Sequence, residues 1–118
     1  MPLAYKSGVR VQSRTLALSH IENCALAAQA GLGYPDVIVV TSINDSRHAK
    51  KSKHYVNAAI DFRTKGPAAN TMGSTARKQK FRRRLAALLG DLFTVILEGL
   101  GKPYEHIHVQ VRKGRSYP

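Results

Sequence analysis

Two short segments of this chain combine histidines with carboxylates at spacings that suit a metal site. In the first, His54 precedes Asp61 by seven residues, so a turn between a loop histidine and a strand aspartate would let both side chains point to one spot. In the second, Glu105 is followed by His106 and His108. Side chains alternate along a strand, so both histidines project from one face. Two imidazoles and a carboxylate form a common set of zinc ligands that leaves a fourth position for water.

Each of these pieces also has a simpler interpretation. A His-x-His pair on a strand is more often an exposed polar face, and an aspartate is more often a cap or turn residue. Asp61, however, lies between Ile60 and Phe62 in a segment that reads as a half-buried strand. An ionised carboxylate in such a place needs a cation, and a metal ion supplies one. The combination therefore favours a metal site.

The elements that must position these residues follow from hydrophobic patterning and from glycine and proline breaks. Cys24 lies on the apolar stripe of the first expected helix and is expected to be a core residue, and no chemical role is expected for His20 or His48. The order predicts a single α+β domain over residues 1–118, with a small antiparallel sheet, helices on one face and a loose arm at residues 1–10. The expected elements are a helix at 13–30, strands at 37–41 and 58–62, a long helix at 75–97 and a last strand at 106–112, with polar loops at 42–53 and 63–74.

Charge is the unusual feature of the composition. The 118 residues include 19 Lys and Arg against 7 Asp and Glu, a formal net charge of +12. Such a surface attracts nucleic acid, anionic lipid or anionic cell-wall polymer. The single cysteine excludes an internal disulfide framework. No apolar run is long enough for a membrane helix, and the first residues do not resemble a signal peptide.

The metal-site pattern resembles a known family of enzymes. The pattern Ser-x-His-x-x-x-x-Ala-x-Asp, followed near the end of the chain by Glu-His-x-His, is similar to that of the zinc D-Ala-D-Ala carboxypeptidases and L-alanyl-D-glutamate endopeptidases of peptidoglycan. These enzymes include small phage endolysins and share a core with the Hedgehog signalling domain. The resemblance spans residues 37–111 and includes a Thr-Ser pair at the end of the preceding strand. Its residues here are Ser52, His54, Ala59, Asp61, Glu105, His106 and His108.

The resemblance implies a role for each residue that matches the motif. His54, Asp61 and His108 would be the zinc ligands. Glu105 would be the catalytic acid–base that takes a proton from the attacking water and passes it to the leaving amine. His106 would stabilise negative charge on the scissile carbonyl oxygen.

Two positions depart from the family pattern. Asn57 stands where the family usually has glycine, and asparagine tolerates the left-handed backbone conformation better than most residues. The family's substrate-binding arginine has no obvious counterpart, and Arg47 is the candidate for it. A missing arginine would affect catalysis rather than folding.

We therefore expect a zinc-dependent peptidase that cleaves peptidoglycan stem peptides. It would be made in the cytoplasm and reach the wall in the manner of a phage lysis protein, and an anionic envelope surface would attract it. The alternative is a non-catalytic basic protein that binds nucleic acid or cell-wall polymer, or a zinc-bearing module that has lost catalysis. The bond cleaved and the oligomeric state stay open. Phosphate contacts in the nucleic-acid alternative would come from Lys50, Lys51, Lys53, Arg82, Arg83 and Arg84.

Overall fold

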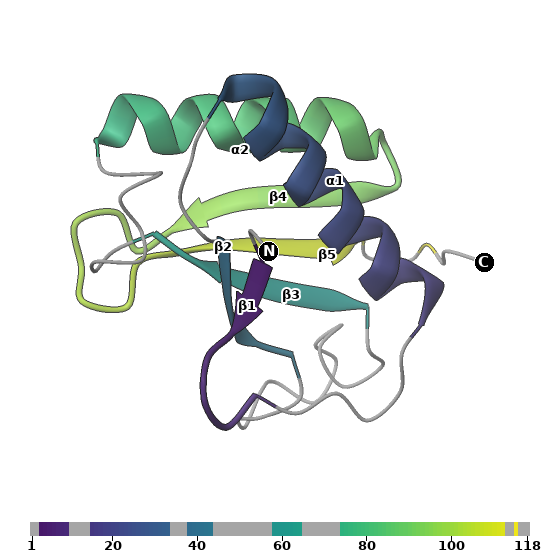
Figure 1. The fold of residues 1–118 in the computed structure, drawn as a ribbon, viewed down its shortest axis with the longest axis horizontal. Coiled ribbons are helices and arrows are strands. Elements are labelled where there is room, and N and C mark those ends of the chain that lie inside the picture. Colours follow the sequence, from purple (N-terminus) through teal and green to yellow (C-terminus); the bar gives the residue numbers. More distant parts are fainter. Residues whose placement is uncertain are drawn as a thin grey trace.

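A computed structural model of the chain describes residues 3–9, 15–33, 38–43, 58–64, 74–112 and 115. Within this part of the chain, five strands form one mixed sheet and two helices pack on it, which confirms the α+β class. Figure 1 shows both helices on the same side of the sheet, as the sequence predicted. The Hedgehog-like arrangement is a finer expectation than this class and stays a prediction. The predicted arm at the N-terminus contains a strand instead.

The order of the strands across the sheet is β1-β2-β3-β5-β4. The prediction of a purely antiparallel sheet was wrong, because β1 lies parallel to β2, while the other neighbouring pairs are antiparallel. The strands are β1 (Leu3–Tyr5), β2 (Ile38–Ser42), β3 (Ala59–Arg63), β4 (Phe93–Glu98) and β5 (His106–Val111).

Helix α1 (Leu16–Leu32) begins and ends as the sequence predicted, to within a few residues. The Thr15 hydroxyl accepts a hydrogen bond from the Leu18 backbone N–H and so caps the first turn. Gly33 ends the helix in the left-handed conformation, with φ of 72°. Cys24 is half-buried and packs against the hydrophobic core, in line with its predicted role.

Helix α2 (Thr75–Leu89) is shorter than the predicted helix at 75–97. Gly90 ends it with φ of 84°, and a turn leads directly into β4, which takes up the last five residues of the predicted helix. The apolar stripe of α2 is therefore Phe81, Leu85 and Leu89, all of them buried, whereas Leu88 is 40% exposed. The helical spacing in the sequence predicts a longer stripe, which is correct for its first two members and wrong beyond Leu85: Phe81, Leu85, Leu88, Leu92 and Ile96.

The core lies between the sheet and the two helices. Alternate residues of each strand enter it, including Val40 from β2, Phe62 from β3 and Val109 from β5, and each of these is fully buried. Successive side chains of a strand point to opposite faces, so the residues between them lie on the face away from the helices. We call that second face the site face.

Candidate metal centre

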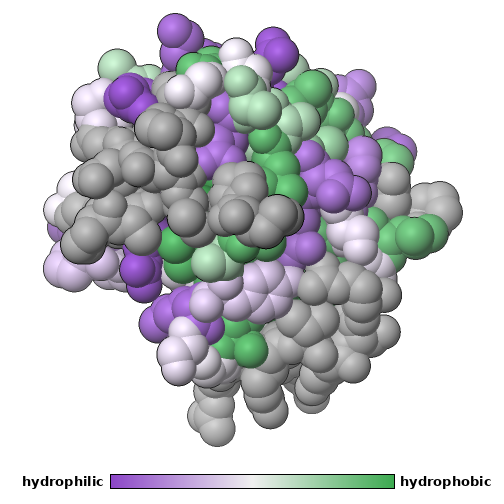
Figure 2. Space-filling view, viewed as in Figure 1, coloured by the Kyte–Doolittle hydropathy of each residue, from purple (hydrophilic) through white to green (hydrophobic). Residues whose placement is uncertain are grey.

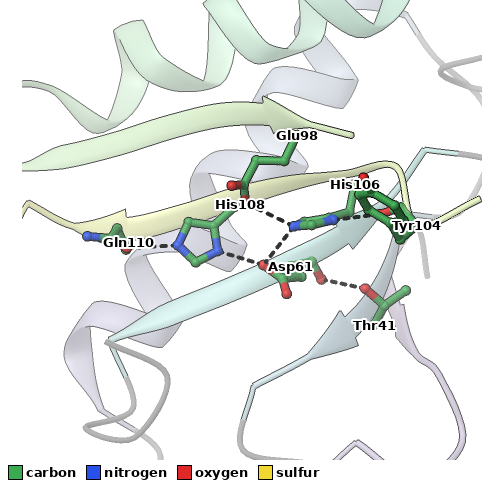
Figure 3. A network of polar contacts seen from close by, with 7 residues as sticks. All are labelled: Thr41, Asp61, Glu98, Tyr104, His106, His108 and Gln110. Carbon is green, nitrogen blue, oxygen red and sulfur yellow. Dashed lines mark hydrogen bonds and ion pairs between the residues drawn. The ribbon is translucent and has the colours of Figure 1, made fainter. Parts of the chain in front are cut away.

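The pairing of β3 with β5 brings Asp61 directly opposite His108 on the site face. Their neighbours Phe62 and Ile107 are buried on the helix side, so strand alternation points Asp61 and His108 the other way. The Nδ1 atom of His108 donates a hydrogen bond of 2.7 Å to Oδ1 of Asp61. The structure thus brings together two residues that the sequence predicted to act as metal ligands (Figure 3).

An irregularity in β2 lies beside this pair. The register between β2 and β3 shifts between Val40 and Ser42, which leaves Thr41 at the bulge. The Thr41 hydroxyl donates a hydrogen bond of 3.3 Å to the backbone carbonyl of Asp61. Bulges of this kind re-aim side chains and are common next to functional sites.

His106 joins the pair from two residues earlier on β5. Its Nε2 lies 3.7 Å from Oδ1 of Asp61 and 3.1 Å from Oε1 of Glu98, which stands opposite it on β4. Its Nδ1 donates to the backbone carbonyl of Tyr104 at 2.8 Å. This second bond fixes the ring with Nε2 turned toward Asp61 and Glu98, as Figure 3 shows.

The charges around His108 favour its protonated form. Burial lowers the pKa of the imidazole, but hydrogen bonds to Asp61 and Gln110, with the charges of Asp61 and Glu98, outweigh burial and raise the pKa above its ordinary value. The Nε2 of the ring donates to Oε1 of Gln110 at 2.8 Å. A proton held this firmly competes with a metal ion for the same ring, so metal affinity would fall at acidic pH.

Asp61, His106 and His108 have the donors and the spacing of a metal site. One ligand atom from each residue lies within 4.8 Å of the other two. Ligands about 2.1 Å from a tetrahedral zinc ion stand about 3.4 Å apart, and the separations of 2.7 Å and 3.7 Å from the Asp61 oxygen bracket that value. The other ring nitrogen of each histidine donates to an oxygen: Nδ1 of His106 to the Tyr104 carbonyl, and Nε2 of His108 to the Gln110 side chain. Hydrogen bonds of this kind orient metal-bound imidazoles. The cluster therefore fits zinc.

Glu105 occupies a different environment from the one that its predicted role requires. Its Oε1 accepts hydrogen bonds from Lys78 and Thr64, both at 2.6 Å, and its Oε2 accepts one from the Gly101 backbone N–H at 2.8 Å. Burial raises the pKa of this carboxyl, but the hydrogen bonds from Lys78, Thr64 and Gly101 and the charge of Lys78 lower it to about 2 overall. In this arrangement the carboxylate is a weak proton acceptor at neutral pH.

A cavity of about 280 Å³ borders the cluster. Asp61 and His106 lie in its wall, next to two basic residues, Lys6 and Arg63. Its remaining lining residues are Thr41, Pro103, Tyr104 and Glu105. A peptide segment that enters this cavity would reach the carboxylate and imidazole groups of the cluster.

The remaining predicted site residues, His54 and Arg47, lie outside the described part of the chain, as does His48. The structure adds Glu98, which sequence reasoning had placed at the end of a helix. The β-branched and apolar run 93–97 after a Gly-Asp pair was the signal that could have identified a strand there. Nothing in the sequence indicated that Lys78 would pair with Glu105.

Comparisons with known proteins do not identify a family. No family model matches the chain, and neither a curated protein nor a solved structure shows significant similarity to it. Functional assignment therefore depends on the chemistry of the cluster and on the motif resemblance.

Proposed function

We propose that this protein is a zinc-dependent peptidase that hydrolyses peptide bonds in peptidoglycan stem peptides. The observation that carries the proposal is the direct pairing of Asp61 with His108 across β3 and β5, with His106 beside them. These residues belong to the sequence motif that resembles the zinc peptidases, and the cavity next to them has room for part of a substrate. A Hedgehog-like form of the α+β fold is part of the same proposal.

Two ligand sets satisfy the chemistry of a catalytic zinc site. Both contain Asp61 and His108, and the third ligand is either His54, as the motif implies, or His106, which lies within reach of Asp61. Each set has two imidazoles and one carboxylate, and each leaves one position open. When bound, zinc activates water at neutral pH and polarises a carbonyl group.

The chain's own residues orient the site and hold its protons. The Tyr104 carbonyl fixes the ring of His106, and that ring is placed to stabilise negative charge at the edge of the cavity. A general-base role for Glu105 requires its carboxylate to leave Lys78, since its two oxygens are occupied in the arrangement seen here. Glu98 is the carboxylate that already contacts His106, and about half of its side chain is exposed.

The substrate class follows from charge and from the motif. Peptidoglycan stem peptides carry several carboxylates, and a chain with a net charge of +12 attracts them. No helix among the described residues has the length and apolar character needed to cross a membrane. Action at the cell wall after release from the cytoplasm, as in phage lysis, is part of the proposal.

The experiment is digestion of purified peptidoglycan with and without a chelator, with the released peptides identified by mass spectrometry. We expect new termini that disappear with the chelator and return with zinc, and their masses would name the bond. An Asp61→Asn variant should release nothing, whereas Asp91→Asn, which changes an exposed turn residue far along the chain from the cluster, should behave as wild type. Unchanged digestion in the presence of the chelator would contradict the proposal.

The second candidate is a non-catalytic basic binding protein. The observation that favours it is the row of exposed basic residues on α2, which includes Arg77, Lys80, Arg83 and Arg84. Phosphate contacts from such a row would give binding that weakens steeply with salt. Strong, salt-sensitive DNA binding that is unaffected by chelation, with no digestion of peptidoglycan, would favour this candidate over the peptidase.

A further inference from the structure

Strand β4 forms one edge of the sheet, and no strand of the described part of the chain pairs with its outer side. The strand at the opposite edge, β1, has only three residues, whereas β4 has six. Proteins commonly protect a long edge strand with a proline, a lysine or a bulge. β4 has none of these: its register with β5 runs without a shift, and its one charged residue is Glu98, at the last position. This edge is therefore open to pairing with another strand.

The hydrogen-bond register shows which backbone groups face the open edge. The Arg112 backbone N–H donates to the Leu92 carbonyl at 2.7 Å, one step beyond the Phe93–Val111 pair. Hydrogen-bonded positions alternate along each strand of an antiparallel pair. Every second residue after Leu92 therefore bonds to β5, and the N–H and C=O groups of Val95 and Leu97 point outward. No described residue outside the sheet forms a hydrogen bond with these outward groups.

A groove of about 250 Å³ borders these outward groups, between β4 and α2. Its lining consists of Val95, Ile96 and Leu97 from β4 and of Gln79 and Arg82 from α2. Ile96 is 43% exposed and stands opposite His108 in the register, so its side chain lies on the site face. The unpaired backbone groups and the groove belong to one surface, which we call the β4 edge and define by these five lining residues.

The groove of the β4 edge holds a cation and no acid. The Nε of Arg82 donates to Oε1 of Gln79 at 2.8 Å, which fixes the guanidinium beside the groove. Arg82 forms no ion pair with any carboxylate of the described residues. Because the whole chain has a net charge of +12, a second copy would bring like charge to this groove. An acidic strand complements the groove better.

We propose that the β4 edge binds an extended acidic peptide, which adds to the sheet as a new strand next to β4. In this mode of recognition, main-chain hydrogen bonds give affinity and alternate side chains give specificity. Val95 and Leu97 form the main-chain bonds. The peptide residue opposite Ile96 is apolar and packs on the site face, while its two neighbours point toward α2, where an acidic side chain pairs with Arg82. The proposal is independent of the peptidase function.

The test uses a fluorescent peptide that alternates the two residue types, Val-Glu-Val-Glu-Val-Glu-Val, with binding measured by anisotropy. An antiparallel peptide with valine opposite Ile96 turns its glutamate N–H groups toward β4 and its valine N–H groups away. N-methylation of the glutamates should therefore abolish binding, whereas N-methylation of the valines should leave it intact. The reverse pattern supports the β4 edge with a parallel peptide. Equal affinity of the two methylated forms overturns strand addition.

Arg82→Gln tests the charge of the groove. It removes one partly exposed charge pair with the peptide, so affinity should fall by about 3- to 10-fold. The matched control is Arg83→Gln, which removes the neighbouring exposed charge outside the groove and should have a smaller effect. A peptide with glutamine in place of glutamate should bind more weakly to wild type and equally to wild type and Arg82→Gln. Equal loss of affinity in the Arg82 and Arg83 variants overturns the role of the groove.

Amide hydrogen exchange followed by NMR locates the bound peptide. The outward N–H groups of Val95 and Leu97 should exchange about 10-fold or more slowly at saturating peptide, because they then donate to peptide carbonyls. The Thr94 and Ile96 amides, which already bond to β5, are the internal reference. Unchanged exchange of Val95 and Leu97, or no binding at millimolar peptide, overturns the proposal. Protection of the same two amides without peptide, in a dimer detected by sedimentation, also overturns it, because a second copy then occupies the edge.

Discussion

At the scale of single residues, the contact between Asp61 and His108 is central to the account. The two side chains are only 14% exposed, and although burial lowers the pKa of the His108 imidazole, its hydrogen bond to Asp61 contributes to a pKa above the ordinary value. A metal ion would replace the shared proton as the cation in this pair. Tyr104 accepts a hydrogen bond from Nδ1 of His106, and Gln110 accepts one from Nε2 of His108. These bonds keep both rings in place with or without the metal ion.

The first prediction concerns the carboxylate. Asp61→Asn preserves the size of the side chain but removes its charge, so zinc affinity should fall by at least about 100-fold. Competition with a chelating dye measures this, and Asp91→Asn is the control for removal of one acid elsewhere in the chain. Zinc affinity equal to that of wild type would remove Asp61 from the ligand set.

The second prediction concerns Glu105 and pH. Its folded pKa of about 2 lies below the ordinary value of 4.5, so the carboxylate contributes stability that is fully present above about pH 4.5 and is lost as the pH falls toward 2. Glu105→Gln should therefore lower the free energy of unfolding by about 3 kcal/mol at pH 7, since it leaves the Lys78 charge buried without its partner. Denaturant titrations of both proteins from pH 2 to 7 should show the difference shrinking at the acidic end.

The control for this prediction is the double variant Lys78→Met with Glu105→Gln, which removes both charges and should recover much of the lost stability. Equal stability of Glu105→Gln and wild type at pH 7, with turnover abolished, would contradict the structural role and support the general-base role of Glu105. Reduced stability of the single variant with normal turnover would remove Glu105 from catalysis.

Among the elements, β5 and its neighbours β3 and β4 place the site, and β4, like β1, is a strand that the sequence did not predict. Leu85 and Leu88 continue an apolar spacing through Leu92 and Ile96, so helical periodicity alone extends α2 across the turn. The structure breaks the helix at Gly90, because its positive φ ends the hydrogen-bonded turns, and the chain then reverses to pair β4 with β5. Pairing with a distant strand is tertiary information that local periodicity does not contain.

Part of the site's geometry followed from the sequence. Alternation within 106–108 put both histidines on one face, and the structure places both of them beside Asp61. The buried neighbours of Asp61 predicted a metal ion as its cation partner, and that stays a prediction. The side-chain partner of Glu105 was not predictable, since Lys78 lies 27 residues away on a helix whose charges all read as solvated. Likewise, the parallel pairing of β1 depends on contacts with β2 that no local pattern encodes.

The third prediction tests the turn between α2 and β4. Gly90 has φ of 84° and ψ of −172°, a region that side-chain-bearing residues rarely occupy, although an added Cβ would meet no atom within 4 Å. Gly90→Ala should therefore destabilise the protein by about 1–3 kcal/mol through backbone strain alone. The control is Ala87→Gly on the exposed face of α2, which should lower the free energy of unfolding by about 1 kcal/mol. It gives the effect of an alanine–glycine exchange within the helix. A Gly90→Ala variant as stable as wild type in denaturant titrations would contradict the turn geometry.

At the scale of the whole molecule, the two faces of the sheet divide structure from chemistry. The helices and the core occupy one face, and the Asp61, His106 and His108 cluster and the cavity lie on the other. Figure 2 shows hydrophilic side chains along the upper rim of this view, over the helices. Because α2 and its exposed basic residues lie on the opposite side of the sheet from the cluster, we expect them to contact an anionic surface while a substrate occupies the cavity.

The fourth prediction concerns this charge. Arg77→Gln combined with Arg83→Gln lowers the formal net charge from +12 to +10 and removes two exposed cations of α2. Binding to sedimented peptidoglycan at low salt should weaken, while turnover of a short soluble peptide should stay unchanged, because the change lies away from the cluster. Reduced turnover of the soluble peptide would place α2 in the catalytic machinery and contradict the division of the two faces.

We propose that Asp61 and His108 hold a zinc ion on the site face. The most direct measurement is a crystal structure of the protein grown with zinc, with anomalous diffraction recorded on both sides of the zinc absorption edge. We predict a single strong peak about 2.0–2.2 Å from an Asp61 oxygen and a His108 nitrogen, with His54 or His106 as the third protein ligand. A fully zinc-supplemented crystal with no peak at this position, or with its peak bound by other residues, would contradict the account.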